Sequence, residues 1–143
     1  MLNGVPKILS PELLKILMEM GHTEEIVIAD GNFPVGSYAK RIVRLDGIDI
    51  PQLLDAILKF FPLDNYVEKP IALMEVVKGD NVIPTIWDEY EKIVKEYDTS
   101  FNEFEYMEKF KFYERTKNAY AVISTGESAL YANILLKKGV VTK

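Results

Sequence analysis

Apolar residues recur every three or four positions in three stretches of the chain, and this spacing predicts amphipathic helices. The stretches are residues 10–21, 49–61 and 85–97, and a shorter helix is expected over residues 109–118. The first helix has the clearest ends. Ser10 can cap its amino end, Pro11 suits the first helical position, and Gly21 can adopt the left-handed conformation that stops a helix.

Between these helices the apolar residues form short continuous runs rich in valine and isoleucine, which is typical of buried strands. Strands are expected over residues 24–30, 41–47, 70–77, 119–125 and 133–139. Residues 78–81 have turn chemistry, and residues 126–131 are expected to form a loop. Because strands alternate with helices and no linker or repeat divides the chain, we predict one α/β domain over residues 1–143, with a central mixed, largely parallel sheet flanked by helices.

The composition is that of an ordinary folded domain and excludes several functions. Of the 143 residues, 48% are hydrophobic and 27% are charged, and the net charge of −5 leaves no basic stripe for phosphates, so no nucleic-acid partner is expected. The absence of cysteine excludes disulfides and thiolate chemistry. No apolar run reaches the length of a membrane span and the amino terminus lacks a signal-peptide pattern, so we expect no membrane contact and a cytoplasmic location.

Sequence motifs for common cofactors are absent. There is no glycine-rich nucleotide fingerprint, no P-loop and no Gly-x-Ser-x-Gly motif, so nucleotide binding and esterase chemistry lack their signatures. With one histidine and no cysteine, a metal site would have to consist mainly of carboxylates, and we expect no metal. The remaining candidates for chemistry are single polar residues near the ends of predicted elements.

His22, the only histidine, follows Gly21 at the end of the first predicted helix. Imidazole can bind and release a proton near neutral pH, and the negative end of a helix dipole favours its charged form, so His22 could act as an acid and a base. It could equally be a capping residue that only completes the helix end. The pattern by itself leaves both roles open.

Asp30 stands at the carboxyl end of the first predicted strand, before Gly31. Ligand crevices of α/β sheets tend to lie at this end. A carboxylate there could accept hydrogen bonds from sugar hydroxyls or hold the imidazole of His22 in one tautomer, although Asp-Gly after a strand is also an ordinary turn. Tyr131 and Asn133 stand at a loop-to-strand junction, where the simplest interpretation is a turn aromatic and an amide bonded to the backbone.

Several stretches in combination resemble the L-fucose mutarotase family, which is similar to the D-ribose pyranase group. The stretches are ILSPELLKILMEMGHTEEIVIADGNFP, RLDGIDIPQLLDAIL, FPLDNYVEKP and FKFYERTKNAYAVISTGESALYANILLKKGV, which together cover nearly the whole chain. The Met-Gly-His…Asp…Phe-Pro and Thr-Gly-Glu…Tyr-x-Asn-x-x-Leu-x-Lys-Gly elements are specific in combination. The resemblance implies a compact, ribose pyranase-like α/β fold and a mutarotase that interconverts the α and β anomers of L-fucose without a cofactor or metal.

The resemblance also implies roles for particular residues. His22 matches the family's acid/base histidine, and Asp30 matches the aspartate that binds sugar hydroxyls and supports the site. Tyr131, Ala132 and Asn133 match the substrate-binding residues of the carboxyl-terminal loop, where the tyrosine contacts the sugar near its ring and anomeric oxygens. The catalytic groups are thus expected to be His22, Asp30 and Tyr131.

Lys109 departs from the family pattern, because fucose-type members usually carry arginine there and ribose-type members carry histidine. It is still expected to bind substrate. Lysine keeps the positive charge but loses the planar fork that can hold two hydroxyls, which opens the question of sugar preference. D-ribose is therefore a second possible substrate. The same residues would also suit a non-catalytic monosaccharide-binding protein, and a purely structural, ring-forming protein is a third hypothesis.

The resemblance further implies assembly into homo-oligomers, commonly pentameric rings stacked as decamers, with active sites near subunit boundaries. An aromatic content of 11% permits an apolar interface without requiring one. We therefore expect a pentamer or decamer on the resemblance alone.

Overall fold

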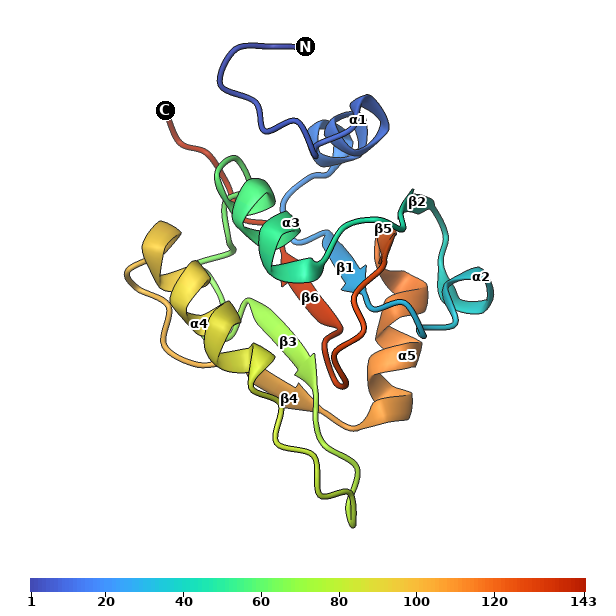
Figure 1. Ribbon diagram of the computed structural model, residues 1–143. Helices are drawn as coiled ribbons and strands as arrows, with labels where there is room; N and C mark the ends of the chain where they lie inside the picture. Colours follow the sequence, from blue (N-terminus) through green and yellow to red (C-terminus); the bar gives the residue numbers. More distant parts are fainter.

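A six-stranded mixed sheet forms the centre of the molecule (Figure 1), whose computed structural model describes all residues, 1–143. The strand order is β2-β5-β1-β6-β3-β4. The strands are β1 (Glu25–Ala29), β2 (Ile42–Leu45), β3 (Ile71–Met74), β4 (Glu105–Met107), β5 (Ala121–Thr125) and β6 (Ile134–Lys137). β6 runs antiparallel to its neighbours β1 and β3, and the other neighbouring pairs are parallel, so the predicted mixed, largely parallel sheet is confirmed.

The direction of β6 gives the sheet two distinct ends. At the carboxyl end the other strands finish and β6 begins, and at the amino end the other strands begin and β6 finishes. Segments that are far apart in the sequence therefore meet at each end.

Helices cover both faces of the sheet. They are α1 (Pro11–Glu19), α2 (Val35–Tyr38), α3 (Ile50–Leu58), α4 (Ile86–Tyr97) and α5 (Lys109–Asn118). Leu13, Leu54 and Tyr90 place α1, α3 and α4 in a core on one face. Val35 and Phe112 place α2 and α5 in a second core on the other face. The sheet is thus the middle of three layers.

The central strand β1 contributes to both cores. Ile26 and Ile28 belong to the first core, and Val27 and Ala29 belong to the second. Successive side chains of a strand point to opposite faces, and all four residues are fully buried. This explains why the strand is continuously apolar rather than alternating in polarity.

Side chains cap the amino ends of two helices, and the cap at Ser10 is the one that the sequence analysis predicts. Ser10 Oγ accepts a hydrogen bond from the backbone N–H of Leu13 at 3.2 Å and caps α1. Asp49 Oδ1 accepts one from the N–H of Gln52 at 3.2 Å and caps α3. These local signals need no tertiary contact, which is why they can be recognised in the sequence.

The predicted stop of the first helix at Gly21 is wrong. α1 ends at Glu19, and the capping residue Met20 is already extended. The left-handed residue is Thr23, with φ of 73°. The N–H of Thr23 donates to the carbonyl of Lys138 at 2.9 Å, so a contact with the far end of the chain shapes this turn.

The sequence pattern also fails to predict two short elements, α2 and β4. α2 is only 4 residues long. β4 is only 3 residues long and pairs with β3 alone, at the outer edge of the sheet. The strand predicted over residues 70–77 is shorter than expected, because only Ile71–Met74 pair. The other predicted helices and strands are confirmed.

Candidate functional site

Most of the candidate residues lie at the carboxyl end of the sheet. Asp30 follows β1, whereas Tyr131, Ala132 and Asn133 precede β6, which begins at this end. Lys109 is the first residue of α5, shortly after the end of β4. Ligand sites of α/β proteins commonly form where strands finish, so this end of the sheet is the candidate binding region.

Asp30 is held firmly in place and is 8% exposed. Its backbone N–H donates to Asn133 Oδ1 at 2.7 Å, and its own Oδ1 accepts from the N–H of Asn32 at 2.9 Å. Burial raises the pKa of the Asp30 carboxyl, and the hydrogen bonds from the N–H groups of Asn32 and Phe33 do not cancel this effect. A partly desolvated carboxylate of this kind gains from accepting hydrogen bonds of ligand hydroxyls.

Gly31 allows two loops to approach closely beside Asp30. Its N–H donates to the carbonyl oxygen of Glu127 at 2.8 Å, and a Cβ at this position would lie 3.3 Å from the same oxygen. Thr125 Oγ1 also donates to the carbonyl of Ala29 at 2.7 Å. The Asp-Gly pair therefore joins the end of β1 to the loop that follows β5.

Two aromatic residues of α4 hold the backbone of residues 131–133. Trp87 Nε1 donates to the carbonyl of Tyr131 at 2.8 Å, and the Tyr90 hydroxyl donates to the carbonyl of Ala132 at 2.7 Å. Tyr131 has a φ of 58°, a left-handed conformation that costs roughly 1–2 kcal/mol in a residue with a side chain. Such strain persists only where the surroundings impose it, and here α4 supplies the restraint.

The Tyr131 hydroxyl is hydrogen-bonded to the loop between β3 and α4, which extends away from the body of the molecule (Figure 1). It donates to Asp80 Oδ2 at 2.6 Å and accepts from the N–H of Val77 at 3.2 Å. The hydrogen bond to Asp80 raises the pKa of Tyr131. The phenol is therefore protonated at neutral pH.

Lys109 lies among aromatic side chains at the start of α5. Its Nζ is 5.7 Å from the ring centre of Phe110 and 5.8 Å from that of Tyr113. The ring centres of Tyr113 and Phe33 are 5.1 Å apart, and burial, followed by the negative charge of Asp30, raises the pKa of Tyr113. Tyr113 is thus a second phenol at this end of the sheet. The sequence did not indicate it, because the aromatic residues of FKFYER have the helical spacing of ordinary packing residues.

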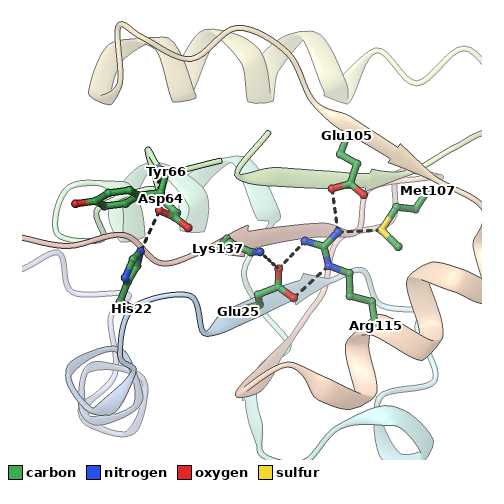
Figure 2. Close-up of polar contacts among 8 residues, drawn as sticks. All are labelled: His22, Glu25, Asp64, Tyr66, Glu105, Met107, Arg115 and Lys137. Atoms are coloured by element: carbon green, nitrogen blue, oxygen red, sulfur yellow. Dashed lines mark hydrogen bonds and ion pairs between the residues drawn. The ribbon is translucent and has the colours of Figure 1, made fainter. Parts of the chain in front are cut away.

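An ion-pair cluster fixes α5 against the sheet (Figure 2). Arg115 Nη2 lies 2.5 Å from Glu25 Oε2 of β1, and Arg115 Nη1 lies 3.0 Å from Glu105 Oε1 of β4. Lys137 Nζ of β6 is 3.8 Å from the same Glu25 oxygen. One helix side chain therefore bridges strands that are not neighbours, and this holds the helix that carries Lys109.

His22 lies at the amino end of the sheet, with its Nε2 3.1 Å from Asp64 Oδ1 (Figure 2). The imidazole is 38% exposed, the Asp64 side chain is 1% exposed, and the ring of Tyr66 is 5.3 Å from the imidazole. The N–H of Asp64 donates to the carbonyl of Lys137 at 3.0 Å, at the end of β6. Sequence reasoning missed Asp64 because it is 42 residues from His22 along the chain.

Asp64 determines which nitrogen of His22 is available. Burial by itself would raise the pKa of Asp64, but hydrogen bonds from the N–H of Tyr66 and from His22 outweigh this effect, and the pKa lies below its ordinary value. An ionised carboxylate can only accept, so Nε2 of the neutral imidazole carries the hydrogen. Nδ1 is then the nitrogen that can take a proton from a ligand.

The structure does not bring His22 and Asp30 together within one chain. Asp30 directly follows β1 and His22 lies three residues before its start, so the 5 residues of the strand, at roughly 3.3 Å each, place about 16 Å of strand between them. The expectation that Asp30 could hold the imidazole is not met within the chain, because Asp64 does so. One chain therefore presents two candidate half-sites, an imidazole half-site, His22 with Asp64, and a carboxyl-end half-site. The members of the latter are Asp30, Lys109, Tyr131, Ala132 and Asn133.

The fold and these candidate half-sites define a class, a small α/β protein with a polar, aromatic-flanked candidate ligand site at the carboxyl end of a mixed sheet. The chain contains no group of three or more histidine, cysteine, aspartate or glutamate side chains that could hold a metal ion. None of its helices is both long and apolar enough to cross a bilayer.

Comparison with known proteins identifies the family. Residues 3–141 match the RbsD / FucU transport protein family, and the chain belongs to this family. It is 51% identical over 144 residues to the fucose mutarotase of Mus musculus, with 96% of this chain and 94% of that protein covered. The family resemblance found in the sequence is thus confirmed.

Two solved structures show the same fold. The fucose mutarotase of Streptococcus pneumoniae in complex with L-fucose has 51% identity and a TM-score of 0.93, with 99% of this chain and 100% of that chain covered. RbsD of Bacillus subtilis complexed with D-ribose has 31% identity and a TM-score of 0.68, with 93% and 95% covered. Both are monosaccharide complexes.

Proposed function

We propose that residues 1–143 form a single L-fucose mutarotase domain, an isomerase that interconverts the α and β anomers of L-fucose. The observation that carries this proposal is the 51% identity and TM-score of 0.93 to a fucose mutarotase bound to L-fucose. The carboxyl-end half-site supports it, because a carboxylate, an amide, a phenol and an ammonium group lie at the same end of the sheet and could bind the hydroxyls of a monosaccharide.

Mutarotation opens the hemiacetal ring and closes it on the other face of the aldehyde. Opening delivers a proton to the ring oxygen and removes one from the anomeric hydroxyl, and closure reverses both transfers. One imidazole working with a phenol or a bound water suffices. The reaction itself needs no redox cofactor, phosphate donor or metal.

In this proposal His22 is the acid and base, and its Nδ1 exchanges the proton while Asp64 holds Nε2. Asp30 accepts hydrogen bonds from sugar hydroxyls. The amide oxygen of Asn133 is already bonded to the backbone of Asp30, so its NH2 group is the part that can donate to the sugar. Lys109 supplies a further donor.

Tyr131 is the second proton-handling or orienting group of the proposal, next to Ala132 in the loop that holds the sugar. Tyr113 is a second candidate for this role, because its phenol lies within the electrostatic influence of Asp30. Phenylalanine substitutions at the two positions separate these candidates. The proton-handling phenol is the one whose loss lowers the exchange rate more than the affinity.

We further propose that the chain works as a cytoplasmic homo-oligomer, a pentamer or decamer, in which His22 of one copy acts on a sugar held by another. The separation of about 16 Å along β1 supports this arrangement, since it prevents one chain from applying both half-sites to one sugar. Ring assembly, which the family resemblance implies, would bring opposite ends of neighbouring copies together.

D-ribose is the second candidate substrate. The similarity to RbsD complexed with D-ribose supports it, at 31% identity and a TM-score of 0.68. Lys109 is also compatible with D-ribose, because a single ammonium group does not select the hydroxyl pair that a guanidinium fork would hold. The stronger similarity to the fucose complex favours L-fucose.

The test is NMR exchange between the α and β anomers at equilibrium, with and without the protein, for L-fucose, D-ribose and D-galactose. Faster exchange of L-fucose that is lost in His22→Ala supports the proposal. Acceleration of D-ribose alone would assign the chain to the pyranase activity. Saturable fucose binding by a folded sample without faster exchange would contradict catalysis and leave a monosaccharide-binding protein.

A further inference from the structure

We infer that Asp80 is a positioning residue that fixes the direction of the Tyr131 hydroxyl, so that this phenol accepts a hydrogen bond from a sugar hydroxyl and does not donate one. The inference rests on the proposed function only in taking a monosaccharide as the ligand of residues 131–133. Asp80 belongs to the loop between β3 and α4, where the sequence predicts a turn, and it is not among the candidate site residues.

The Tyr131 phenol has one hydrogen and two lone pairs with which to form hydrogen bonds. The hydrogen points to Asp80 Oδ2 at 2.6 Å, and the N–H of Val77 occupies one lone pair at 3.2 Å. Only the second lone pair remains for a ligand. A sugar hydroxyl that meets this oxygen must therefore donate to it.

Asp80 is itself restrained. Its backbone N–H donates to the carbonyl of Val77 at 2.9 Å, and its Oδ1 accepts from the N–H of Val82 at 3.2 Å. The preceding Gly79 has a φ of 92°, which a side chain would disfavour. With Oδ1 engaged inside the loop, Oδ2 is the oxygen presented to Tyr131.

Tyr131, the other partner of this hydrogen bond, is restrained as well. The left-handed backbone of Tyr131 and the hydrogen bond from Trp87 to its carbonyl set the point from which the phenol extends. Both ends of the 2.6 Å hydrogen bond are thus anchored in separate segments. The direction of the hydroxyl follows from the loop and not from the ligand.

Asp80→Asn reverses this direction at almost constant size. The amide oxygen is needed by the N–H of Val82, so the NH2 group faces the phenol and donates to it. Tyr131 then receives two N–H groups and turns its own hydrogen to the ligand. The opposite amide orientation is also unfavourable, because NH2 would face the N–H of Val82.

The experiment measures affinity for L-fucose by calorimetry and anomer exchange by NMR. The proteins are the wild type, Asp80→Asn, Tyr131→Phe, the double variant, and Asn81→Ala as a control on the same loop. We expect Asp80→Asn to weaken affinity about tenfold, which corresponds to the loss of one hydrogen bond from the sugar to the phenol. In the Tyr131→Phe background the same substitution should have no further effect, because Asp80 acts through the phenol. Asn81→Ala should match the wild type.

Two results would overturn the inference. One is unchanged affinity in Asp80→Asn, and the other is an equal loss from Asp80→Asn with and without the phenol, which would mean a general effect of the loop. Failure of the proposed function looks different, because the wild type would then bind L-fucose without accelerating exchange. The affinity cycle still decides the role of Asp80 in that case.

Discussion

Asp64 can be altered without removing the imidazole that it holds, so it separates orientation of His22 from its chemistry. Asp64→Asn keeps the size of the side chain but no longer demands a hydrogen on Nε2. We expect anomer exchange to fall about ten- to hundredfold with fucose affinity nearly unchanged. In His22→Ala the rate of anomer exchange should fall about a hundred- to ten-thousandfold. A fully active Asp64→Asn variant would mean that the carboxylate does not orient the imidazole.

The lowered pKa of Asp64 also predicts a response of stability to acid. The folded chain binds this proton less readily than the unfolded chain, so the contribution is present above the ordinary value of 3.8. It is lost as pH falls through the lower pKa of the folded state. Urea unfolding from about pH 2 to 6 should therefore show a steeper acid loss in the wild type than in Asp64→Asn. Parallel curves would contradict this prediction.

The contribution of Asp30 to stability depends on pH in the opposite direction. Its pKa is raised in the folded chain, so its contribution to stability is fully present below the ordinary value of 3.8 and is lost as pH rises through the raised value. At neutral pH the buried charge therefore destabilises the fold. Asp30→Asn can keep the hydrogen bond from the N–H of Asn32 while removing that charge.

We accordingly expect Asp30→Asn to unfold at a higher temperature than the wild type at pH 7, while fucose affinity falls about tenfold or more. Thermal unfolding and calorimetry measure the two effects. A variant with lower stability and unchanged affinity would mean that Asp30 serves the fold and not the ligand.

At the scale of elements, α4 matters because it holds residues 131–133, of which Tyr131 has a strained backbone. Tyr90→Phe leaves the buried carbonyl of Ala132 without its partner, which should cost about 1–3 kcal/mol in the free energy of unfolding and also weaken fucose binding. Tyr97→Phe is the matched control, since its hydroxyl bonds Asp55 at 2.8 Å on the exposed side of the same helix. That variant should change stability by less than about 0.5 kcal/mol. Equal effects in urea unfolding would argue against a special role of Tyr90.

The sequence predicts those elements whose causes are local. Continuous apolar runs and amino-terminal caps depend only on neighbouring residues. The ends of the strands could therefore be predicted, and with them the positions of Asp30 and Asn133. The short strand β4 depends on pairing with β3, and the left-handed Thr23 depends on Lys138. The role of Asp64 could not be predicted for the same reason, because only the folded chain brings it to His22.

At the scale of the whole molecule, the two half-sites predict complementation between two impaired copies, measured at a fucose concentration too low to saturate Asp30→Asn. His22→Ala keeps its carboxyl-end half-site, and Asp30→Asn keeps its imidazole half-site. If the copies are mixed, unfolded and refolded together, random pairing should restore about a quarter of the wild-type exchange rate. Separately refolded samples mixed without exchange of subunits are the control. No recovery in co-assembled oligomers would contradict a site shared between copies.

The reversed direction of β6 gives this strand one end in each half-site. Asn133 just before it binds Asp30, and Lys137 at its other end binds the backbone of Asp64. Inserting two residues into β6 would preserve which side chains face which core, yet it would displace one half-site by about 7 Å relative to the other. In the proposed oligomer, where two copies share one site, the length of β6 must therefore match the distance between the half-sites that neighbouring copies contribute.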